Sequence, residues 1–451
     1  MSTHSKFMLL FIILLVLAAP RIENCKSDTN SEYSGIISLD ETVYTIHAPD
    51  DAELNVYRKI KGFNTAAREN CLVGINESEF EEIKLFEGHI INKDGDTVRV
   101  VELEDGDSYC GFSGYALYHD ICSYIFNLTS SNYPFTVEYK YRVKLKSVFF
   151  WPDWKLQSTI PVDSSIYTVI APSDYKFDFQ IQGPIPNPEV SKSGGKLKYT
   201  WALSGIEAFE EEDCLINSYQ FMHRVMFVPS KFKLGKYKFL GSDWKMLGND
   251  YNNMVKKCFE MSDEQIDLVD SISSRTTSAD SIIQILHGLM AEKTRYVAIE
   301  IGVGGWRPSI SKDTYARGYG DCKDLATMYV SMLRHAGLNA NLAVVRTRTQ
   351  GLISPNYPAL NRFNHVILYI VDGRDTVWLD PTCQHCLAGD LPWYDENIYV
   401  LAVDESGGQI IKTPPSMPED NTISRKAEIE ISYKKSIDVQ VDFSIRGNPR
   451  H

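Results

Sequence analysis

A chain of 451 residues is too long for one hydrophobic core and predicts two or three domains. Its formal net charge of −13, without any cluster of lysine or arginine, argues against nucleic acid as a partner. The nine cysteines permit disulfides, provided that the chain is exported.

Residues 1–19 are expected to form a secretory signal. Lys6 ends a short polar segment, and residues 7–17 form an apolar run too short to span a bilayer. A retained anchor is the alternative. Cys25 follows Ile22-Glu-Asn instead of small apolar residues, which disfavours lipidation. We expect an exported protein, periplasmic or associated with the cell envelope, without a membrane span once the signal is removed.

Residues 35–245 have the pattern of an antiparallel β-sandwich. Period-two or β-branched runs occur at 36–39, 97–101, 135–143 and 167–170. Turn signals rich in Gly, Asn and Pro separate them. Trp151, Trp154 and Trp201 are interpreted as core or inter-sheet packing, with an aromatic sugar platform as the alternative.

A polar linker with a short helix at 251–258 is expected over residues 246–265. A helix over 281–293 follows, in which Ile282, Ile285 and Leu286 form one apolar face. Residues 295–301 read as a strand, and 302–305 are glycine-rich. No Gly-Lys-Ser/Thr follows these glycines, so they do not form a phosphate loop.

The stretch Gly318-Tyr-Gly-Asp-Cys-Lys-Asp-Leu-Ala predicts a loop that runs into a helix beginning near Cys322. Asp321 is a favourable N-cap residue, apolar residues then recur at helical spacing, and Gly337 is placed to end the helix. A thiol attacks as the thiolate, and a helix N-terminus beside an imidazolium favours that form. Unpaired N–H groups at the same helix start can bind the oxygen of a tetrahedral intermediate.

Two further polar side chains lie downstream on predicted strands. His365 falls in an apolar run at 363–370, Asp372-Gly signals a turn, and residues 376–379 form the next strand before Asp380. Antiparallel pairing would bring His365 and Asp380 together. Taken singly, each of these residues is most simply structural. Together, the order of thiol, imidazole and carboxylate favours Cys322 as nucleophile, His365 as base and Asp380 as the group that orients the base.

These residues resemble the transglutaminase-like superfamily, which has a papain-type fold and a Cys–His–Asp triad. The matching motifs are Gly320-Asp-Cys-Lys-Asp-Leu-Ala326, His365, and Trp378-Leu-Asp-Pro-Thr382. The motif with Lys323 directly after the cysteine resembles that of exported bacterial members of the superfamily, which carry a β-rich domain of unknown function ahead of the core. One departure is Ile367, where the family often has an aromatic residue. The resemblance covers residues 265–405 well and 35–245 more weakly.

The expected fold class is α+β, with four segments. They are a signal peptide (1–19), the β-sandwich domain (35–245), the transglutaminase-like core (265–405) and the start of a C-terminal β-domain (415–451). The last rests on two alternating strands at 427–433 and 437–445, which cannot form a stable domain alone.

Several other residues carry open alternatives. Arg346 and Arg348 lie on one face of a predicted strand. They either form a solvated edge or contact a carboxylate of the substrate. The loop at 350–364 is expected to shape the entrance to the site. Tyr315 and Trp306 are candidates, by position only, for a second oxyanion donor.

The cysteines other than Cys322 number eight, which is compatible with four disulfides of unknown connectivity. They are Cys25, Cys71, Cys110, Cys122, Cys214, Cys258, Cys383 and Cys386. Cys110 and Cys122 can staple a loop. Cys383-Gln-His-Cys386 resembles half a metal site, but structural or redox cysteines are the preferred interpretation.

We therefore expect an exported cysteine enzyme that acts on amide or peptide bonds through a thioester, with hydrolysis favoured over crosslinking. Its substrate would be a protein or peptide, and no cofactor or metal is expected. The alternative is a catalytically silent binding or assembly module of the cell envelope. A weaker third hypothesis is a thiol-redox role for Cys383 and Cys386, which lack the strand-then-helix setting of a thioredoxin-like motif.

Overall fold

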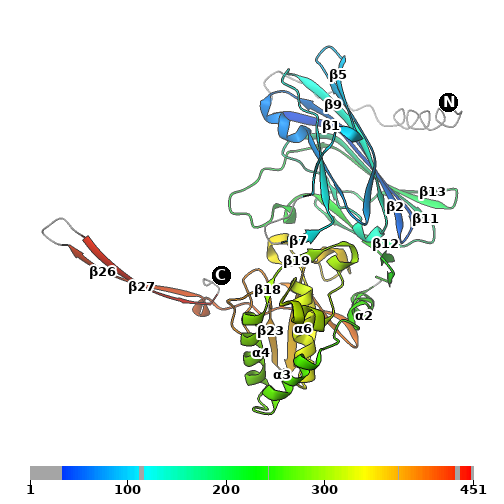
Figure 1. Ribbon diagram of the computed structural model, residues 1–451. Coiled ribbons are helices and arrows are strands. Elements are labelled where there is room, and N and C mark those ends of the chain that lie inside the picture. The colour runs from blue at the N-terminus through cyan, green and yellow to red at the C-terminus, as the bar shows by residue number, and fades with distance from the viewer. Residues whose placement is uncertain (1–32, 111–115, 242, 374, 432–436, 448–451) are drawn as a thin grey trace.

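A computed structural model describes residues 33–110, 116–241, 243–373, 375–431 and 437–447 (Figure 1). The expected signal at 1–19 and Cys25 lie outside these residues. Within them, none of the helices combines the length and hydropathy needed to cross a membrane.

An eight-stranded sheet dominates the N-terminal part of the chain, with strand order β13-β14-β11-β1-β2-β9-β4-β5. Its strands are β1 (Gly35–Ala48), β2 (Asp51–Gly62), β4 (Glu81–Ile91), β5 (Thr97–Glu102), β9 (Phe135–Leu145), β11 (Val162–Pro172), β13 (Glu189–Ser193) and β14 (Lys196–Ile206). The pairing is antiparallel except between β1 and β11, which run parallel. The runs predicted as strands thus lie in one β-rich domain.

Two three-stranded sheets complete this domain. They are β10 (Trp154–Lys155), β15 (Arg224–Pro229) and β12 (Phe177–Gln182), and β3 (Leu72–Glu77), β8 (Cys122–Asn127) and β6 (Asp107–Tyr109). The Trp151 ring stacks on Phe227 of β15 with centroids 4.7 Å apart, and its Nε1 donates to the Tyr167 hydroxyl. Trp154 and Trp201 are also buried, so all three tryptophans are packing residues, not a sugar platform.

The second half of the chain is built on an antiparallel sheet of order β23-β22-β21-β24-β25. Its strands are β21 (Asn339–Val345), β22 (His365–Asp372), β23 (Asp375–Leu379), β24 (Tyr399–Asp404) and β25 (Gly407–Lys412). Four helices pack on one face: α2 (Trp244–Val255), α3 (Asp263–Ser273), α4 (Ala279–Lys293) and α6 (Cys322–His335). The other face is covered by Leu391 and Ile398 from the segment between β23 and β24. The sheet extends beyond residue 405, the expected end of the core.

Helix α2 overlaps the short helix expected at 251–258 but begins at Trp244 and ends at Val255, and it belongs to the core and not to a linker. It packs its apolar side into the helical layer of the core, and Gly248 makes this approach to β25 possible. A Cβ at Gly248 would lie 2.2 Å from the Cα of Gly408, so only glycine fits there. In α4, Ile283 and not Ile285 completes the buried face beside Ile282 and Leu286, because Ile285 is exposed.

The two halves meet through backbone and polar contacts. β7 (Ala116–His119) of the N-terminal domain pairs in parallel with β19 (Ala298–Glu300) of the core. Asn361 Nδ2 donates to the Phe149 carbonyl at 3.0 Å, and Arg362 forms an ion pair with Asp153 at 2.6 Å. Shorter elements complete the core, namely β18 (Arg295–Tyr296), α5 (Ser311–Arg317) and β20 (Tyr319–Gly320).

At the C-terminal end, β26 (Thr422–Ile431) and β27 (Ile437–Arg446) form a hairpin that projects away from the core (Figure 1). Among the described residues these strands pair only with each other.

Two disulfides occur among the described residues, whereas the eight cysteines other than Cys322 are compatible with up to four. Cys110–Cys122 and Cys383–Cys386 are bonded, which makes Cys383-Gln-His-Cys386 a structural staple in this state. Free thiols remain at Cys71, Cys214, Cys258 and Cys322.

Candidate active site

Cys322 is the first residue of α6, as the sequence predicts. The Asp321 carboxylate caps the helix by accepting from the Asp324 N–H at 3.1 Å. Gly320 is required by the tight entry, because a Cβ there would lie 2.6 Å from the Cβ of Asp324. The helix leaves the N–H groups of Cys322 and Lys323 without an intrahelical partner.

The first turn of α6 is anchored by buried charges. Lys323 and Asp321 form an ion pair and are 4% and 1% exposed. Burial raises the pKa of Asp321 to about 6, although Lys323 opposes this shift. Asp324 accepts from the Ser309 N–H at 2.7 Å and pairs with Arg317 at 3.5 Å. These contacts fix the position of the neighbouring sulfur.

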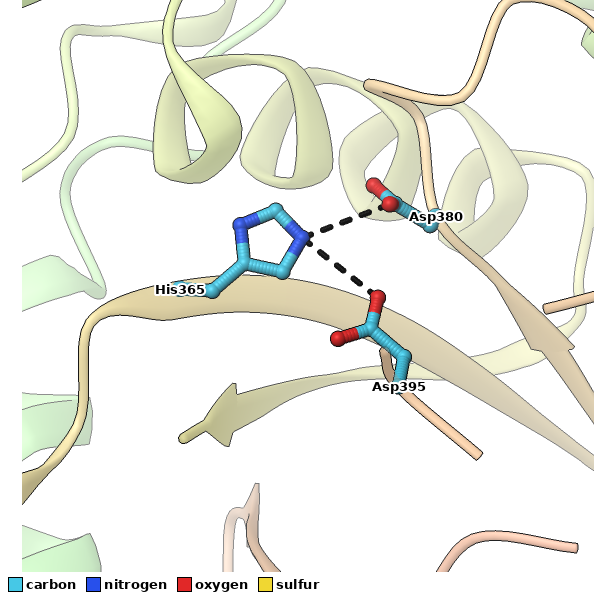
Figure 2. Close-up of side chains that lie close together, drawn as sticks. All are labelled: His365, Asp380 and Asp395. Atoms are coloured by element: carbon cyan, nitrogen blue, oxygen red, sulfur yellow. Dashed lines mark ion pairs between the residues drawn. The ribbon is translucent and has the colours of Figure 1, made fainter. Parts of the chain in front are cut away.

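His365 begins β22, and Asp380 follows β23, so the hairpin brings them together as expected. His365 Nε2 lies 3.4 Å from Asp380 Oδ2 (Figure 2). The other oxygen, Oδ1, accepts from the Thr382 N–H at 2.9 Å and from its hydroxyl at 2.8 Å. The Asp-Pro-Thr sequence therefore supplies both the acid and the group that orients it.

A second acid, Asp395, was missed by the sequence analysis. Its Oδ2 lies 3.6 Å from the same His365 nitrogen, and its side chain is fully buried (Figure 2). Neither of its oxygens has a hydrogen-bond partner among the described residues, so ionisation there is costly. Burial first, and then the carboxylate of Asp380, raise the pKa of Asp395 to about 8, against the opposing influence of His365.

The imidazole is held in its charged form. Burial alone would lower the pKa of His365, but Asp380 and then Asp395 outweigh it and raise that pKa well above its usual range. The neighbouring Cys322 acts in the same direction on the pKa of His365, and the thiol and the ring line the same cavity. Since Nε2 faces both acids and the other ring nitrogen points away from them, Nδ1 is left for the thiol (Figure 2). The pKa of Asp380 is lowered, because His365 and Thr382 overcome the effect of burial.

The ligand atoms of His365, Asp380 and Asp395 also lie within 4.8 Å of one another. One nitrogen and two carboxylates are a donor set that divalent cations accept. A cation there would compete with the proton on Nε2, which a chelator experiment can distinguish.

Cys322 and His365 open into a cavity of about 380 Å³ between the two domains. Phe80, Glu81 and Asp120 of the N-terminal domain face the core across it. Burial and the neighbouring Asp120 raise the pKa of Glu81 to about 7. The loop before His365 contributes Phe363 and Asn364, which agrees with its expected place at the entrance.

The candidates for an oxyanion donor can now be separated. The Tyr315 hydroxyl donates to Glu264 at 3.2 Å and is engaged outside the cavity, which removes this candidate. Trp306 lines the cavity. Tyr251 of α2 lines it too, is 1% exposed, and has a hydroxyl without a hydrogen-bond partner among the described residues. Burial and then the nearby Cys322 raise the pKa of Tyr251.

Ile367, the departure from the family pattern, is fully buried on the sheet face opposite the helices. It does not line the cavity, so this substitution changes the core and not the substrate-facing wall.

Comparison with protein families gives two matches. Residues 266–380 match the model of the transglutaminase-like superfamily, and residues 76–210 match a domain of unknown function, DUF3857. The first match ends at Asp380 and contains Cys322 and His365. None of the curated proteins matches the chain.

Among solved structures, a candidate protease from Parabacteroides distasonis superposes with a TM-score of 0.64 at 14% identity, over 89% of this chain and 78% of that one. This similarity extends the shared fold over both domains. An M1 zinc metallopeptidase from Deinococcus radiodurans aligns over 46% of this chain and 47% of its own chain, at 9% identity. Its TM-score of 0.23 is too low to indicate a shared fold.

Proposed function

We propose that this chain, a member of the transglutaminase-like superfamily with a preceding DUF3857 domain, is an exported cysteine hydrolase of amide or peptide bonds. The observation that carries the proposal is that Cys322 and His365 line one cavity, while Asp380 lies behind the imidazole with its Oδ2 3.4 Å from His365 Nε2. The protease-like neighbour supports a peptide as substrate.

In the acylation step, the Cys322 sulfur attacks the carbonyl carbon while His365 holds the proton that left the thiol. The carbonyl oxygen becomes an oxyanion, which the N–H groups at the start of α6 and the Tyr251 hydroxyl stabilise. The C–N bond then breaks, His365 gives its proton to the departing amine, and a thioester remains on Cys322.

In the second step, water attacks the thioester carbon and His365 takes one of its protons. The C–S bond breaks, the carboxylic acid leaves, and the proton returns to the thiol. Asp380 keeps the imidazole oriented through both steps. Asp395, neutral below a pH of about 8, can donate a hydrogen bond to Asp380 and so limits the negative charge beside His365.

Water is the acceptor favoured by the cavity. Its volume of about 380 Å³ is large enough to hold several water molecules. Transfer to an amine would instead benefit from a site that excludes water.

The test is formation of an acyl-enzyme. The protein is incubated with a fluorogenic peptide library and with p-nitrophenyl acetate, and intact-mass spectrometry follows the acyl adduct. We expect turnover and a transient adduct in the wild type, neither in Cys322→Ala, and both in Cys214→Ala, the exposed free thiol away from the site.

Two further arms separate the alternatives. EDTA should leave the rate unchanged, whereas loss of activity that Zn²⁺ or Mn²⁺ restores would assign the acids and His365 to a metal. Absence of any adduct, together with slow iodoacetamide labelling of Cys322 at pH 6, would favour a catalytically silent binding module.

Export is part of the proposal. The Cys110–Cys122 and Cys383–Cys386 bonds support it, because disulfides persist in oxidising compartments. Fractionation of the producing cells should place the protein outside the cytoplasm.

A further inference from the structure

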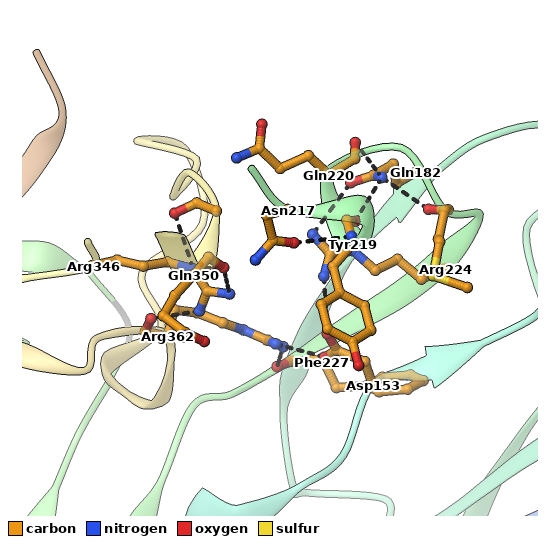
Figure 3. A network of polar contacts seen from close by, with 12 residues as sticks. Asp153, Gln182, Asn217, Tyr219, Gln220, Arg224, Phe227, Arg346, Gln350 and Arg362 are labelled. Carbon is orange, nitrogen blue, oxygen red and sulfur yellow. Dashed lines mark hydrogen bonds and ion pairs between the residues drawn. The ribbon is translucent and has the colours of Figure 1, made fainter. Parts of the chain in front are cut away.

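A second cavity, of about 220 Å³, lies where strands β12 and β15 meet the loop that leads to His365. Three arginines line it, Arg224 from the N-terminal domain and Arg346 and Arg362 from the two ends of that loop (Figure 3). None of these residues takes part in the proposed chemistry.

The charges around this cavity do not balance. Asp153 pairs with Arg362 at 2.6 Å and with Arg224 at 3.6 Å. The described residues that line the cavity include three arginines and no acid, and Asp153 is the carboxylate that pairs with two of them, which leaves an excess of two positive charges.

The arginines lie close enough to lower one another's pKa. Burial, then Arg362 and Arg224, lower the pKa of Arg346 to about 10. Burial and Arg362 also lower the pKa of Arg224, although Asp153 opposes this. Arg224 is 8% exposed, and its Nε has no hydrogen-bond partner among the described residues. A buried cation with an unused donor is costly unless an anion compensates it.

The arginines are held in place before any ligand arrives. Arg346 donates from Nε to the carbonyls of Gln350 and Gly351 at 2.9 and 3.1 Å, and from Nη1 to that of Arg362 at 2.6 Å. Gln182 accepts from Arg224 at 3.4 Å, while its own amide donates to three backbone carbonyls (Figure 3). Fixed guanidinium groups lose little entropy on binding an oxyanion.

We propose that this cavity is an anion-binding site for a single carboxylate or phosphate group. Guanidinium groups match the planar or tetrahedral oxygens of these anions, and the volume suits one such group with a small substituent. The site is connected to the triad through the chain, because Val345 pairs with His365 across the sheet and Arg346 and Arg362 flank these strands.

The direct test is isothermal titration calorimetry of the full chain with sodium phosphate at constant ionic strength set by sodium chloride. We expect saturable binding with a dissociation constant of about 1 mM or tighter, as two charge-assisted hydrogen bonds would give. Arg224→Gln should weaken binding at least about tenfold. Arg348→Gln removes the same charge from a half-buried position on the same loop that does not line the cavity, and it should bind like the wild type.

A second variant tests the site without removing the ion-pair partner of Asp153, as Arg224→Gln does. Ser354→Asp places a carboxylate in the cavity wall, so it should raise Tm and abolish phosphate binding. Wild-type protein without saturable heat, or equal binding by the wild type and Arg224→Gln, would overturn the proposal.

The source of the anion is a separate measurement, and only this arm rests on the proposed hydrolysis. If the anion is the substrate's own carboxylate, phosphate inhibits competitively and amidation of the peptide C-terminus raises KM. If it is a free ligand, phosphate changes kcat or Tm without competition. Failure of hydrolysis leaves the calorimetric result standing, so the two proposals fail separately.

Discussion

Asp395 Oδ2 lies 3.6 Å from His365 Nε2, nearly as close as Asp380 Oδ2 at 3.4 Å. Two buried acids therefore share one imidazole. Their environments push their pKa values apart, because Thr382 donates two hydrogen bonds to Asp380 and no donor reaches Asp395 within the described part of the chain. The arrangement has one ionised and one neutral acid at neutral pH.

We predict that Asp395→Asn flattens the dependence of stability on pH. The pKa of Asp395, about 8 in the folded state, exceeds its ordinary value of 3.8. Its contribution is therefore complete below a pH of about 4 and is lost as the pH rises through about 8. The raised pKa of His365 acts in the same sense, at higher pH. Thermal melts from pH 5 to 9 should show a smaller fall in Tm for Asp395→Asn, which should melt several degrees above the wild type at pH 9.

The matched control for this experiment is Asp390→Asn, which removes the same charge from an exposed loop position. It should follow the wild-type profile. Parallel profiles for Asp395→Asn and the wild type would show that Asp395 is ionised throughout.

We predict that Tyr251→Phe lowers kcat by about 10²-fold, as loss of an oxyanion donor does elsewhere. KM and Tm should change little, because the hydroxyl has no other partner among the described residues. The control is Tyr329→Phe, whose hydroxyl donates to the His287 carbonyl at 3.2 Å. That variant should lose about 1 kcal/mol of stability and keep its kcat. An unchanged kcat in Tyr251→Phe would leave the oxyanion to the helix N-terminus.

Gly320→Ala tests how tightly the start of α6 is held. Its Cβ would lie 2.6 Å from that of Asp324, so the backbone must move at a cost of about 1–3 kcal/mol. Displacement of the adjacent sulfur should also lower kcat. Gly288→Ala in α4 is the control, because nothing lies within 4 Å of its Cβ, and it should stabilise the protein by about 0.4–1 kcal/mol.

The buried pair Lys323–Asp321 can be tested by a double-mutant cycle. Lys323→Met alone leaves an unpaired carboxylate and should cost about 3–5 kcal/mol in urea unfolding. Asp321→Asn keeps an N-cap residue and removes the charge. The double variant should therefore be more stable than Lys323→Met. Strictly additive effects would show that the two charges do not interact.

The parts of the site predicted from sequence carry local signals. The start of α6 is marked by Gly320 and Asp321, and the β22–β23 hairpin by alternation around Asp372-Gly. Asp395 carries no such signal, because it lies in an irregular segment whose path depends on packing against the sheet. Asp395 lies beside His365 because of tertiary packing, which no periodic pattern in the sequence predicts.

The misreading of α2 has a different cause. The segment around it is polar on average, which suggested a linker. Leu247, Tyr251, Met254 and Val255 nevertheless recur at helical spacing, and all are buried. This spacing predicts a helix with one buried face, and such a helix would place Tyr251 in the core near the site. The even number of remaining cysteines was equally uninformative, because parity does not decide which thiols meet.

The wall opposite the thiol belongs to another domain than the thiol itself. Phe80, Glu81 and Asp120 come from the N-terminal half, while Cys322 and His365 come from the core. Bond-making chemistry and the choice of which molecules enter can therefore diverge independently in evolution. If the proposed hydrolysis holds, exchanging the N-terminal half between homologues should transfer substrate selectivity and leave the reacting groups unchanged.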